Sequence, residues 1–381
     1  MPPRARYTGL IAKYLERLPV ADDARLIGLS EGQTPLVRLP QIPADLGRDV
    51  DLYVKFEGLN PTGSFKDRGM TMAVTQAVSQ GAKAIICAST GNTSASAAAY
   101  AARAGISCFV LIPDGKIAMG KLAQAVMHGA QVLQIRGNFD AGMRLVKELA
   151  EHAPLTIVNS INPYRLQGQK TAAFEVIEEL GRAPDYHCLP VGNAGNITAH
   201  WIGYAESAAG PGGDEARLTD ACAFCQGGCR YASGVVSRRP RMVGYQAAGS
   251  APFLRGGPVT HPETVATAIR IGAPQSWDYA QAVRAESGGW FDELTDAEIL
   301  QAQRTLAEHE GIFCEPASAS SVAGAMRDIA SGRIAEGSTV VCTLTGHGLK
   351  DPDVAVEQAG DAVQTVDADY DAVRQAILQR L

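Results

Sequence analysis

Short apolar runs alternate with segments of helical length along most of this 381-residue chain. The pattern predicts strands at residues 51–57, 84–89, 108–113, 131–136, 155–159, 186–191, 241–246 and 338–345. The segments between them, such as residues 70–80, 94–103, 139–152 and 171–180, are amphipathic or rich in small residues, which predicts helices. Strands and helices that alternate in this way form a mostly parallel, doubly wound sheet with helices on both faces. The predicted fold class is therefore α/β.

Length and charge narrow the class of protein further. The chain exceeds the usual size of a single core, which favours two domains with a small-molecule cleft at their interface. The net charge is −6 and the basic residues are scattered singly, so we expect no nucleic-acid partner. No stretch approaches the roughly 18 uncharged apolar residues that span a bilayer, and the first residues lack the apolar core of a signal peptide. We therefore expect a cytoplasmic protein without a membrane partner.

Three of the predicted strands are followed by loops of glycine and small polar residues. These loops are Thr90–Ser94, Gly192–Asn196 and Gly346–Gly348. In doubly wound sheets, ligands bind beyond the carboxyl ends of the strands. The three loops would place glycines, hydroxyls and amides at one rim, where we expect the functional site.

Lys66 lies in the segment Pro61-Thr-Gly-Ser-Phe-Lys-Asp-Arg68, which opens a predicted helix directly after a strand and a turn. An amine becomes a nucleophile toward an aldehyde when its pKa is lowered, and burial among apolar groups or a nearby cation has that effect. Phe65 and Arg68 can supply these two effects, the apolar surroundings and the nearby cation. The alternative is a solvated lysine in the first turn of a helix, balanced by Asp67.

The loop Gly192-Asn-Ala-Gly-Asn196 follows a predicted strand and precedes a predicted helix at residues 197–207. Its backbone N–H groups and the helix dipole would form an anion site that fits a phosphate. It is not a Walker loop, because no Gly-Lys-Ser/Thr follows, and it lacks the dinucleotide fingerprint Gly-x-Gly-x-x-Gly. The alternative is a glycine-rich turn that only allows a tight connection from strand to helix.

The loop Ser89-Thr-Gly-Asn-Thr-Ser94 runs into a helix composed almost entirely of small residues, which leaves room for a ligand. Asn92 carries both a donor and an acceptor and can bond a phenolic oxygen. Thr90 and the loop amides can bind a carboxylate. Helix capping explains the same Thr and Asn equally well.

A series of short segments gives the chain a resemblance to a known family. They are Glu31-Gly-Gln-Thr-Pro-Leu36, Asn60-Pro-Thr-Gly-Ser-Phe-Lys-Asp-Arg68, Ala88-Ser-Thr-Gly-Asn-Thr-Ser94, Gly115-Lys-Ile-Ala118, Gly120-Lys-Leu-Ala-Gln124, Asn159-Ser-Ile-Asn-Pro-Tyr-Arg165, Val191-Gly-Asn-Ala-Gly-Asn196, Glu315-Pro-Ala-Ser318 and Leu344-Thr-Gly-His-Gly-Leu-Lys-Asp351. In this order they resemble the fold-type II pyridoxal-phosphate (PLP) enzymes, the tryptophan synthase β family, and within it the threonine synthase family. The resemblance spans about residues 28–354. It implies two doubly wound, mostly parallel sheets, an active site between two domains, and PLP as the cofactor.

The resemblance assigns a cofactor site residue by residue. Lys66 would be the catalytic residue and hold PLP as a Schiff base, while Asn92 would bond the 3′ oxygen of the cofactor. The loop residues that would cradle its phosphate are Gly192, Asn193, Ala194, Gly195 and Asn196. Thr345 would face the pyridine nitrogen. A hydroxyl there cannot keep that nitrogen protonated as a carboxylate would, so we expect a weaker electron sink.

The resemblance also implies the substrate and the reaction. Ser89, Thr90 and Asn92 would hold the substrate carboxylate. Ser160, Asn162 and Arg165 match the segment that resembles the substrate-phosphate site of the family, and arginine suits bidentate phosphate binding. The alternative for Ser160 and Asn162 is that they only shape the turn before Pro163.

The implied reaction is that of a PLP-dependent lyase, which converts O-phospho-L-homoserine and water into L-threonine and phosphate by γ-elimination and β-addition of water. Lys66 would move most of the protons. Two other functions stay open. One is a serine/threonine dehydratase or another PLP β/γ-replacement lyase, and the other is a catalytically idle PLP-fold protein that regulates or binds a partner.

We expect a discontinuous large PLP-binding domain at residues 1–65 and 160–381, a small α/β domain at residues 66–159, and a homodimer. A polar, turn-rich insert at residues 210–240 departs from the family pattern. Its Cys222, Cys225 and Cys229 are candidate metal ligands, with His200 or His261 as a fourth. Structural zinc sites usually have two pairs of closely spaced ligands, however, and only one such pair is present here. Free surface thiols are the alternative. We expect Cys87, Cys108, Cys188 and Cys342 to be reduced core residues because they lie inside apolar runs.

Overall fold

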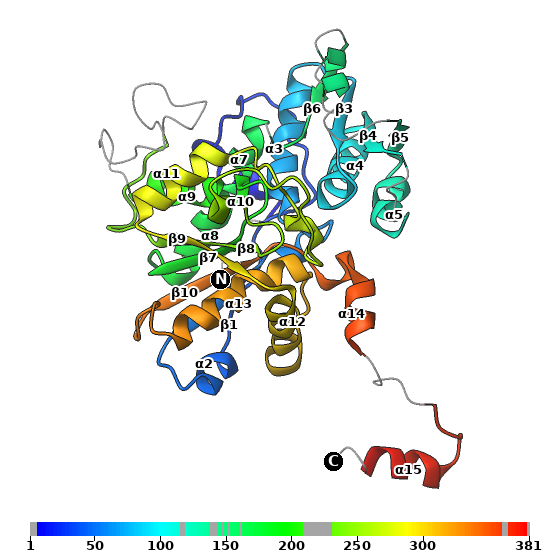
Figure 1. Cartoon of the computed structure of the whole chain (residues 1–381). Helices are drawn as coiled ribbons and strands as arrows, with labels where there is room; N and C mark the ends of the chain where they lie inside the picture. The colour runs from blue at the N-terminus through cyan, green and yellow to red at the C-terminus, as the bar shows by residue number, and fades with distance from the viewer. Residues whose placement is uncertain are drawn as a thin grey trace. The chain divides into compact units, whose positions relative to one another are not determined.

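Two sheets organise the first 350 residues of the chain, and Figure 1 shows them in a computed structural model. The structure describes residues 6–114, 119–136, 144–146, 148–150, 153–160, 162–208, 231–359 and 365–378. Residues 1–350 form one compact unit and residues 351–381 another, and each is described by itself.

The larger sheet has six strands in the order β1-β2-β10-β7-β8-β9. Their bounds are Leu36–Arg38 (β1), Asp51–Phe56 (β2), Tyr186–Pro190 (β7), Arg241–Ala247 (β8), Trp290–Leu294 (β9) and Thr339–Leu344 (β10). All neighbours are parallel except β1, which runs antiparallel to β2 at the edge. Every residue of β7 and β10 is buried, as expected for central parallel strands with helices on both faces.

The smaller sheet has four parallel strands in the order β5-β4-β3-β6. Their bounds are Ala84–Ala88 (β3), Ser107–Pro113 (β4), Gln131–Ile135 (β5) and Leu155–Ile157 (β6). Because the strands are parallel, the carboxyl ends of β3 and β6 lie at one edge. The segments that follow these two strands contain several of the predicted site residues.

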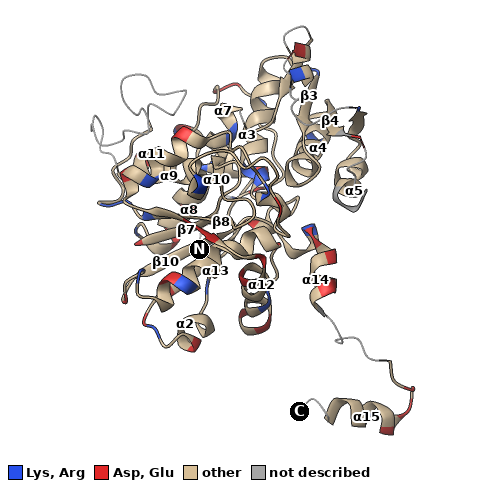
Figure 2. Cartoon of the chain, viewed as in Figure 1, with Lys and Arg blue, Asp and Glu red and all other residues tan. Residues whose placement is uncertain are grey.

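Helices connect the strands in both sheets. In the first unit they include α1 (Leu10–Lys13), α2 (Gln41–Asp45), α3 (Lys66–Ser79), α4 (Asn92–Ala104), α5 (Met119–Met127), α7 (Pro163–Gln169), α8 (Thr171–Leu180), α9 (Gly195–Ala208), α10 (Pro252–Arg255), α11 (Trp277–Ser287), α12 (Asp296–Glu310) and α13 (Pro316–Ala330). Helix α13 packs against β7, β8, β9 and β10, and α4 packs against β3 and β4. Charged side chains of both signs are scattered over these described elements (Figure 2).

Several apolar clusters pack against the two sheets, and the two largest belong to different sheets. One core joins β2, β7, β8 and β10 to α12 and α13, and its members include Val54, Val243, Leu306 and Val340. The other joins β3 and β4 to α3 and α4 and includes Ile85, Val110 and Tyr100. Cys87, Cys108, Cys188 and Cys342 are buried and free, which confirms the prediction that they are reduced packing residues.

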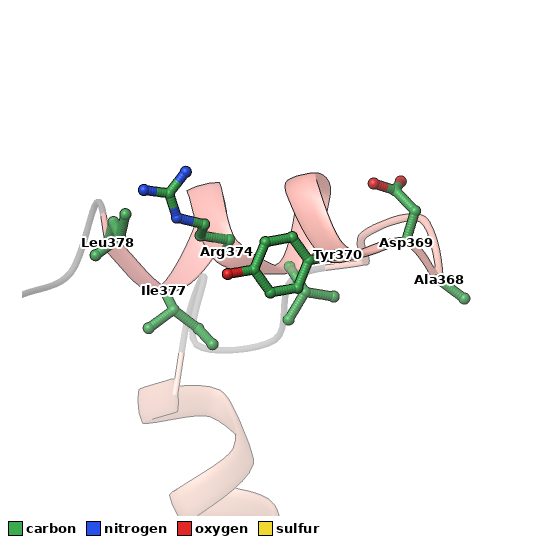
Figure 3. Close-up of a pocket in the computed structure, with 7 residues that line it drawn as sticks. Ala368, Asp369, Tyr370, Arg374, Ile377 and Leu378 are labelled. Atoms are coloured by element: carbon green, nitrogen blue, oxygen red, sulfur yellow. The ribbon is translucent and has the colours of Figure 1, made fainter.

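The second unit contains α14 (Pro352–Ala359) and α15 (Tyr370–Leu378). Figure 3 shows a shallow apolar hollow on α15, and its lining includes Tyr370, Val373 and Ile377. No residue of the predicted site lies in it. Among the described residues, no helix is both long and apolar enough to cross a membrane.

The α/β class and the two mostly parallel sheets are confirmed, and all the predicted strands are present within one or two residues of their predicted ends. Strands β1 and β9 were missed. The first is a three-residue antiparallel edge strand, and the second carries Asp292 and Glu293, so neither forms an apolar run. The domain boundaries at residues 65–66 and 159–160 stay a prediction. The Cys222, Cys225 and Cys229 hypothesis lies outside the described residues.

Candidate active site

Lys66 lies next to the carboxyl end of β10. The backbone N–H of Phe65 donates to the carbonyl oxygen of Thr345 at 2.9 Å, and Ser64 forms an antiparallel bridge with Gly346. The segment that leads into α3 therefore runs along the end of the central strand. This places the first residue of α3 at the rim of the large sheet, as predicted.

Buried ionic groups hold the first turn of α3 in place. Arg68, which is 1% exposed, pairs with Glu57 of the segment after β2 and with Glu175 of α8, each at 2.6 Å. The carboxylate of Asp67 accepts hydrogen bonds from the backbone N–H of Thr62 at 2.7 Å and from the hydroxyl of Ser96 at 2.6 Å. Removing the partner of a buried charged group would leave that charge uncompensated, which is costly, so these contacts are expected to form together. These contacts fix the position from which Lys66 extends.

The amine of Lys66 is poised to lose its proton near neutral pH. Burial lowers its pKa to about 7, and the positive charge of Arg165 lowers it further, against the opposing effect of Glu315. The side chain is partly exposed, but enough protein surrounds the amine to disfavour its charged form. An amine with this pKa is available as a free base, which is what bonding to an aldehyde requires.

Arg165 is a nearly buried cation on α7, with 1% of its surface exposed. Its Nη1 donates to the carbonyl oxygen of Val158 at 3.3 Å, and its Nε has no hydrogen-bond partner among the described residues. Burial lowers its pKa to about 10, which still leaves the guanidinium charged at neutral pH. A buried charge costs free energy unless it is paired, so this arginine suits an anionic ligand.

The loop from Gly192 to Asn196 joins β7 to α9, as predicted. Ala194 has a φ of 63°, in the left-handed region, and α9 begins at the next residue. Both polar atoms of the Asn196 amide are buried without a hydrogen-bond partner among the described residues. A Cβ atom at Gly192 would lie 3.1 Å from the Cα atom of Ile269, so the loop packs closely against the backbone at Ile269. Unpartnered polar atoms at a helix N-terminus fit a bound phosphate.

Asn92 and Thr345 meet at a third residue, Glu315. The Asn92 amide nitrogen lies 3.0 Å from Glu315 Oε2, and the Thr345 hydroxyl donates to Glu315 Oε1 at 3.1 Å. Glu315 precedes α13, yet its side chain does not cap that helix. The small-sheet and large-sheet parts of the predicted site are thus brought together at one carboxylate.

The predicted substrate residues lie in two loops that are joined at their base. The side chain of Asn159 donates to and accepts from the backbone of Ala88, at 3.0 Å each, which ties the segment after β6 to the end of β3. Ser89 and Thr90 follow Ala88, and both are partly exposed. The structure therefore holds the Ser89–Ser94 loop close to the segment that leads to Arg165.

Asn162 serves as the N-cap of α7. Its side-chain oxygen accepts from the backbone N–H of Tyr164 at 3.0 Å, and its amide nitrogen donates to the carbonyl oxygen of Ile157 at 2.8 Å. Both amide atoms are used locally, which favours the turn-shaping alternative for this residue. A substrate role for Asn162 and for the partly exposed Ser160 stays a prediction.

Residue-type reasoning did not select Glu315 or Asn159 as site residues. Each lies in a segment that contributes to the resemblance, Glu315-Pro-Ala-Ser318 and Asn159-Ser-Ile-Asn-Pro-Tyr-Arg165, which was the available signal. A lone carboxylate or amide has many possible roles, however, and only the fold shows which groups it contacts.

Two candidate metal ligands, His200 and His261, fall within the described part of the chain. His200 is buried, with its Nδ1 2.9 Å from the carbonyl oxygen of Asn196 and its ring edge-on to that of His187. His261 is exposed. Within the described ranges, no group of three or more His, Cys, Asp or Glu side chains is arranged to hold a metal ion.

Comparison with known proteins gives the family. Residues 27–346 match the family model described as pyridoxal-phosphate dependent enzyme. A threonine synthase from Synechocystis is 56% identical over 360 residues, which is 94% of this chain and 87% of that protein. Threonine synthases from Mycobacterium tuberculosis and Methanocaldococcus jannaschii are 54% and 45% identical, over 94% and 96% of this chain and 93% and 86% of theirs.

The chain belongs to the threonine synthase family of pyridoxal-phosphate dependent enzymes. The resemblance stated from sequence is therefore confirmed.

Solved structures of more distant proteins share the fold of this threonine synthase family member. A serine racemase from maize superposes with a TM-score of 0.66 at 18% identity, covering 92% of both chains. An O-ureido-L-serine synthase has a TM-score of 0.65 at 21% identity, covering 92% of this chain and 97% of its own. At these identities the likeness concerns the fold alone.

Proposed function

We propose that this protein is a pyridoxal-phosphate-dependent threonine synthase that converts O-phospho-L-homoserine and water into L-threonine and inorganic phosphate. The observation that carries the proposal is the pair formed by Lys66 and Arg165. A lysine whose pKa is lowered to about 7 lies within electrostatic reach of a buried arginine whose Nε is unpaired among the described residues. A nucleophilic amine next to a site for an anion suits a phosphorylated substrate.

The residues present fit the cofactor. Lys66 would bond its aldehyde, the loop Gly192–Asn196 would hold its phosphate, and Asn92 and Thr345 would contact its ring. The buried, unpartnered amide of Asn196 supports the phosphate assignment. When bound, pyridoxal phosphate supplies an electron sink for negative charge that develops on the substrate carbons.

Arg165 would bind the substrate phosphate, because a guanidinium makes two parallel hydrogen bonds to phosphate oxygens. The loop that holds Ser89, Thr90 and Asn92 would bind the substrate carboxylate. The link from Asn159 to Ala88 would keep the two anion sites at a fixed separation. That separation would orient the γ-carbon, which carries the leaving phosphate, relative to Lys66.

Lys66 would act as the proton carrier. Its amine would take one proton from Cα and one from Cβ of the bound substrate as phosphate leaves from Cγ. It would then return one proton to Cγ, which becomes the methyl group, and one to Cα after the hydroxyl of water has added at Cβ. Because its pKa lies near neutrality, the amine can both accept and donate a proton at working pH. The positive charge of Arg165 lowers the pKa of Lys66, and the negative charge of Glu315 raises it.

A serine/threonine dehydratase is the second candidate, since a threonine deaminase shares the fold with a TM-score of 0.62 at 21% identity. The substrates of a dehydratase carry no phosphate, so the buried guanidinium of Arg165 would have no anionic substrate group to bind. The catalytically idle alternative is disfavoured because the Lys66 amine has the pKa of a reactive group. We further propose that the enzyme is a cytoplasmic homodimer, as expected from the sequence and its resemblance to this family.

The two enzymes are separated by their products. The cofactor-loaded protein is supplied with O-phospho-L-homoserine, L-serine or L-threonine, and phosphate, pyruvate and 2-oxobutyrate are measured. We expect stoichiometric phosphate and threonine from O-phospho-L-homoserine, and loss of both in Lys66→Ala. Fast release of 2-oxobutyrate from threonine, with no phosphate release from O-phospho-L-homoserine, would identify a dehydratase instead.

A further inference from the structure

A basic hollow lies at the amino-terminal edge of the large sheet. It has a volume of about 260 Å³, and its lining includes Asp185, Arg238, Arg239, Arg241 and Ser338. Asp185 comes directly before β7, Ser338 comes directly before β10, and Arg241 is the first residue of β8. These three strands are adjacent and parallel, so the hollow lies at the opposite ends of the strands from the proposed cofactor site.

Backbone hydrogen bonds fix the floor of this basic hollow. The N–H of Asp185 donates to the carbonyl oxygen of Thr339, and the N–H of Arg241 donates to the carbonyl oxygen of Asp185, each at 2.9 Å. The backbone at Asp185 therefore ties the amino end of β10 to that of β8. The side chains of Asp185 and Arg241 start from positions that the sheet determines.

Asp185 is the one acidic residue among the described residues that line the hollow. Its Oδ2 accepts from the backbone N–H of Thr339 at 2.9 Å and from Arg182 Nη2 at 3.2 Å, and its Oδ1 lies 2.8 Å from Arg238 Nη2. Partial burial opposes ionisation, but the Thr339 N–H and the two guanidinium groups hold the pKa of Asp185 below its usual value. One ionised carboxylate thus serves two arginines.

Arg241 brings a further positive charge to the same edge. Its side chain is exposed and has no hydrogen-bond or ion-pair partner among the described residues. Arg182, Arg238 and Arg241 together carry three positive charges against the one negative charge of Asp185. A hollow with an excess of one charge concentrates ions of the opposite charge, which here are anions.

We propose that the basic hollow binds a small phosphate-bearing ligand at a site separate from the active site. A guanidinium presents its N–H donors in a planar fork that matches two phosphate oxygens. Arg238 and Arg241 would donate to different oxygens, and the hydroxyl of Ser338 would add a neutral donor. At about 30 Å³ for each water molecule, the hollow has the volume of roughly nine waters, which suits one or two phosphate groups.

The test is calorimetric titration of the full-length, cofactor-loaded protein with pyrophosphate in sodium chloride buffer. We expect saturable binding by the wild type. Arg238→Gln/Arg241→Gln should weaken it by about tenfold or more, because hydrogen bonds to a charged group are lost. Arg239 is kept, since its guanidinium carbon lies 4.7 Å from the centre of the Trp201 ring and its removal would also remove that packing.

Two further variants serve as controls. Arg284→Gln/Arg304→Gln removes the same number of charges from exposed positions on α11 and α12 and should bind pyrophosphate as the wild type does. Arg165→Ala should also keep this binding, because Arg165 belongs to the proposed active site. If the double variant of the hollow does not fold, Arg241→Gln alone replaces it and should also weaken binding, since this side chain has no described partner to lose.

A parallel titration with a nucleoside diphosphate shows where the phosphate group comes from. Tighter binding of pyrophosphate, which we expect from the volume of the hollow, would identify an inorganic anion, and tighter binding of the nucleoside diphosphate would identify a nucleotide. Absence of binding, equal losses in the two double variants, or loss in Arg165→Ala alone would overturn the inference. Each of these results would leave the proposed function standing, because it does not depend on the basic hollow.

Discussion

Lys66 and Arg165 place two basic side chains in the same region, and their surroundings give them different states at neutral pH. Burial lowers the pKa of Lys66 to about 7 and that of Arg165 to about 10. The lysine is therefore a usable base while the arginine stays a cation. The chemistry that we propose needs both.

The reactivity of Lys66 should depend on pH in a way that reports its pKa. Only the unprotonated amine attacks an aldehyde, so in the cofactor-free protein the rate of reaction with pyridoxal phosphate should rise with pH through a midpoint of about 7. An ordinary lysine would give a midpoint near 10.4. Absorbance of the Lys66–cofactor linkage measures the rate, and Lys66→Ala corrects for other amines. A midpoint near that of an ordinary lysine would contradict the pKa.

Removing Arg165 should weaken binding of the phosphorylated substrate. A hydrogen bond to a charged group contributes about 1.5–3 kcal/mol, so Arg165→Ala should raise KM for O-phospho-L-homoserine by roughly 10- to 150-fold. Steady-state phosphate release measures the change. Arg304→Ala on the exposed face of α12 is the control and should leave KM unaltered. An unchanged KM in Arg165→Ala would exclude this residue from the phosphate site.

Some residues of the site could be predicted from sequence and others could not. Lys66 and the Gly192–Asn196 loop stand in local contexts that carry their chemistry, a helix start and a glycine turn after a strand. Glu315 was not predicted as a site residue, because its importance comes from contacts with Asn92 and Thr345, which lie 223 and 30 residues away in sequence.

Among the elements, the crossing of α3 and α7 connects the two basic residues. The helices approach through glycines: a Cβ atom at Gly168 would lie 1.7 Å from the carbonyl oxygen of Arg68, and one at Gly69 would lie 2.9 Å from that of Arg165. Backbone contact this close fixes the distance between Lys66, at the start of α3, and Arg165 on α7.

Adding a methyl group at the crossing should separate the helices. Gly168→Ala should lower the free energy of unfolding by about 1–3 kcal/mol or more, because backbone atoms cannot move aside as side chains do. Thermal unfolding of the cofactor-free protein measures the loss. Gly257→Ala is the matched control, since a Cβ atom there meets nothing within 4 Å. Equal stability of the two variants would show that the crossing is looser than described.

The apolar strands could be predicted from sequence because a strand that is buried on both faces has hydrophobic residues at successive positions. Helix α7 could not be predicted, because it contains Pro163 and Gly168, two residue types that usually interrupt helices. Pro163 is tolerated because it follows the N-cap, and Gly168 is needed for the close contact with α3. Strand β9 was hidden for a related reason. An edge strand with carboxylates at its centre needs its neighbour β8 to be recognised.

For the whole molecule, every residue of the proposed site lies within residues 1–350, and residues 351–381 form a unit of their own. A chain that ends at Ala359, and so lacks α15, should therefore load pyridoxal phosphate at Lys66 as the full chain does. Cofactor absorbance per protein measures the loading. A marked loss of loading would mean that the C-terminal residues contribute to the site.

The central claim is that the γ-carbon–oxygen bond of O-phospho-L-homoserine breaks and that water supplies the new hydroxyl. Turnover in ¹⁸O-labelled water, followed by mass spectrometry of both products, tests this directly. We predict one ¹⁸O atom in the threonine hydroxyl and none in the released phosphate, because the phosphate leaves with its ester oxygen. Labelled phosphate with unlabelled homoserine would show hydrolysis at phosphorus and contradict the proposed reaction.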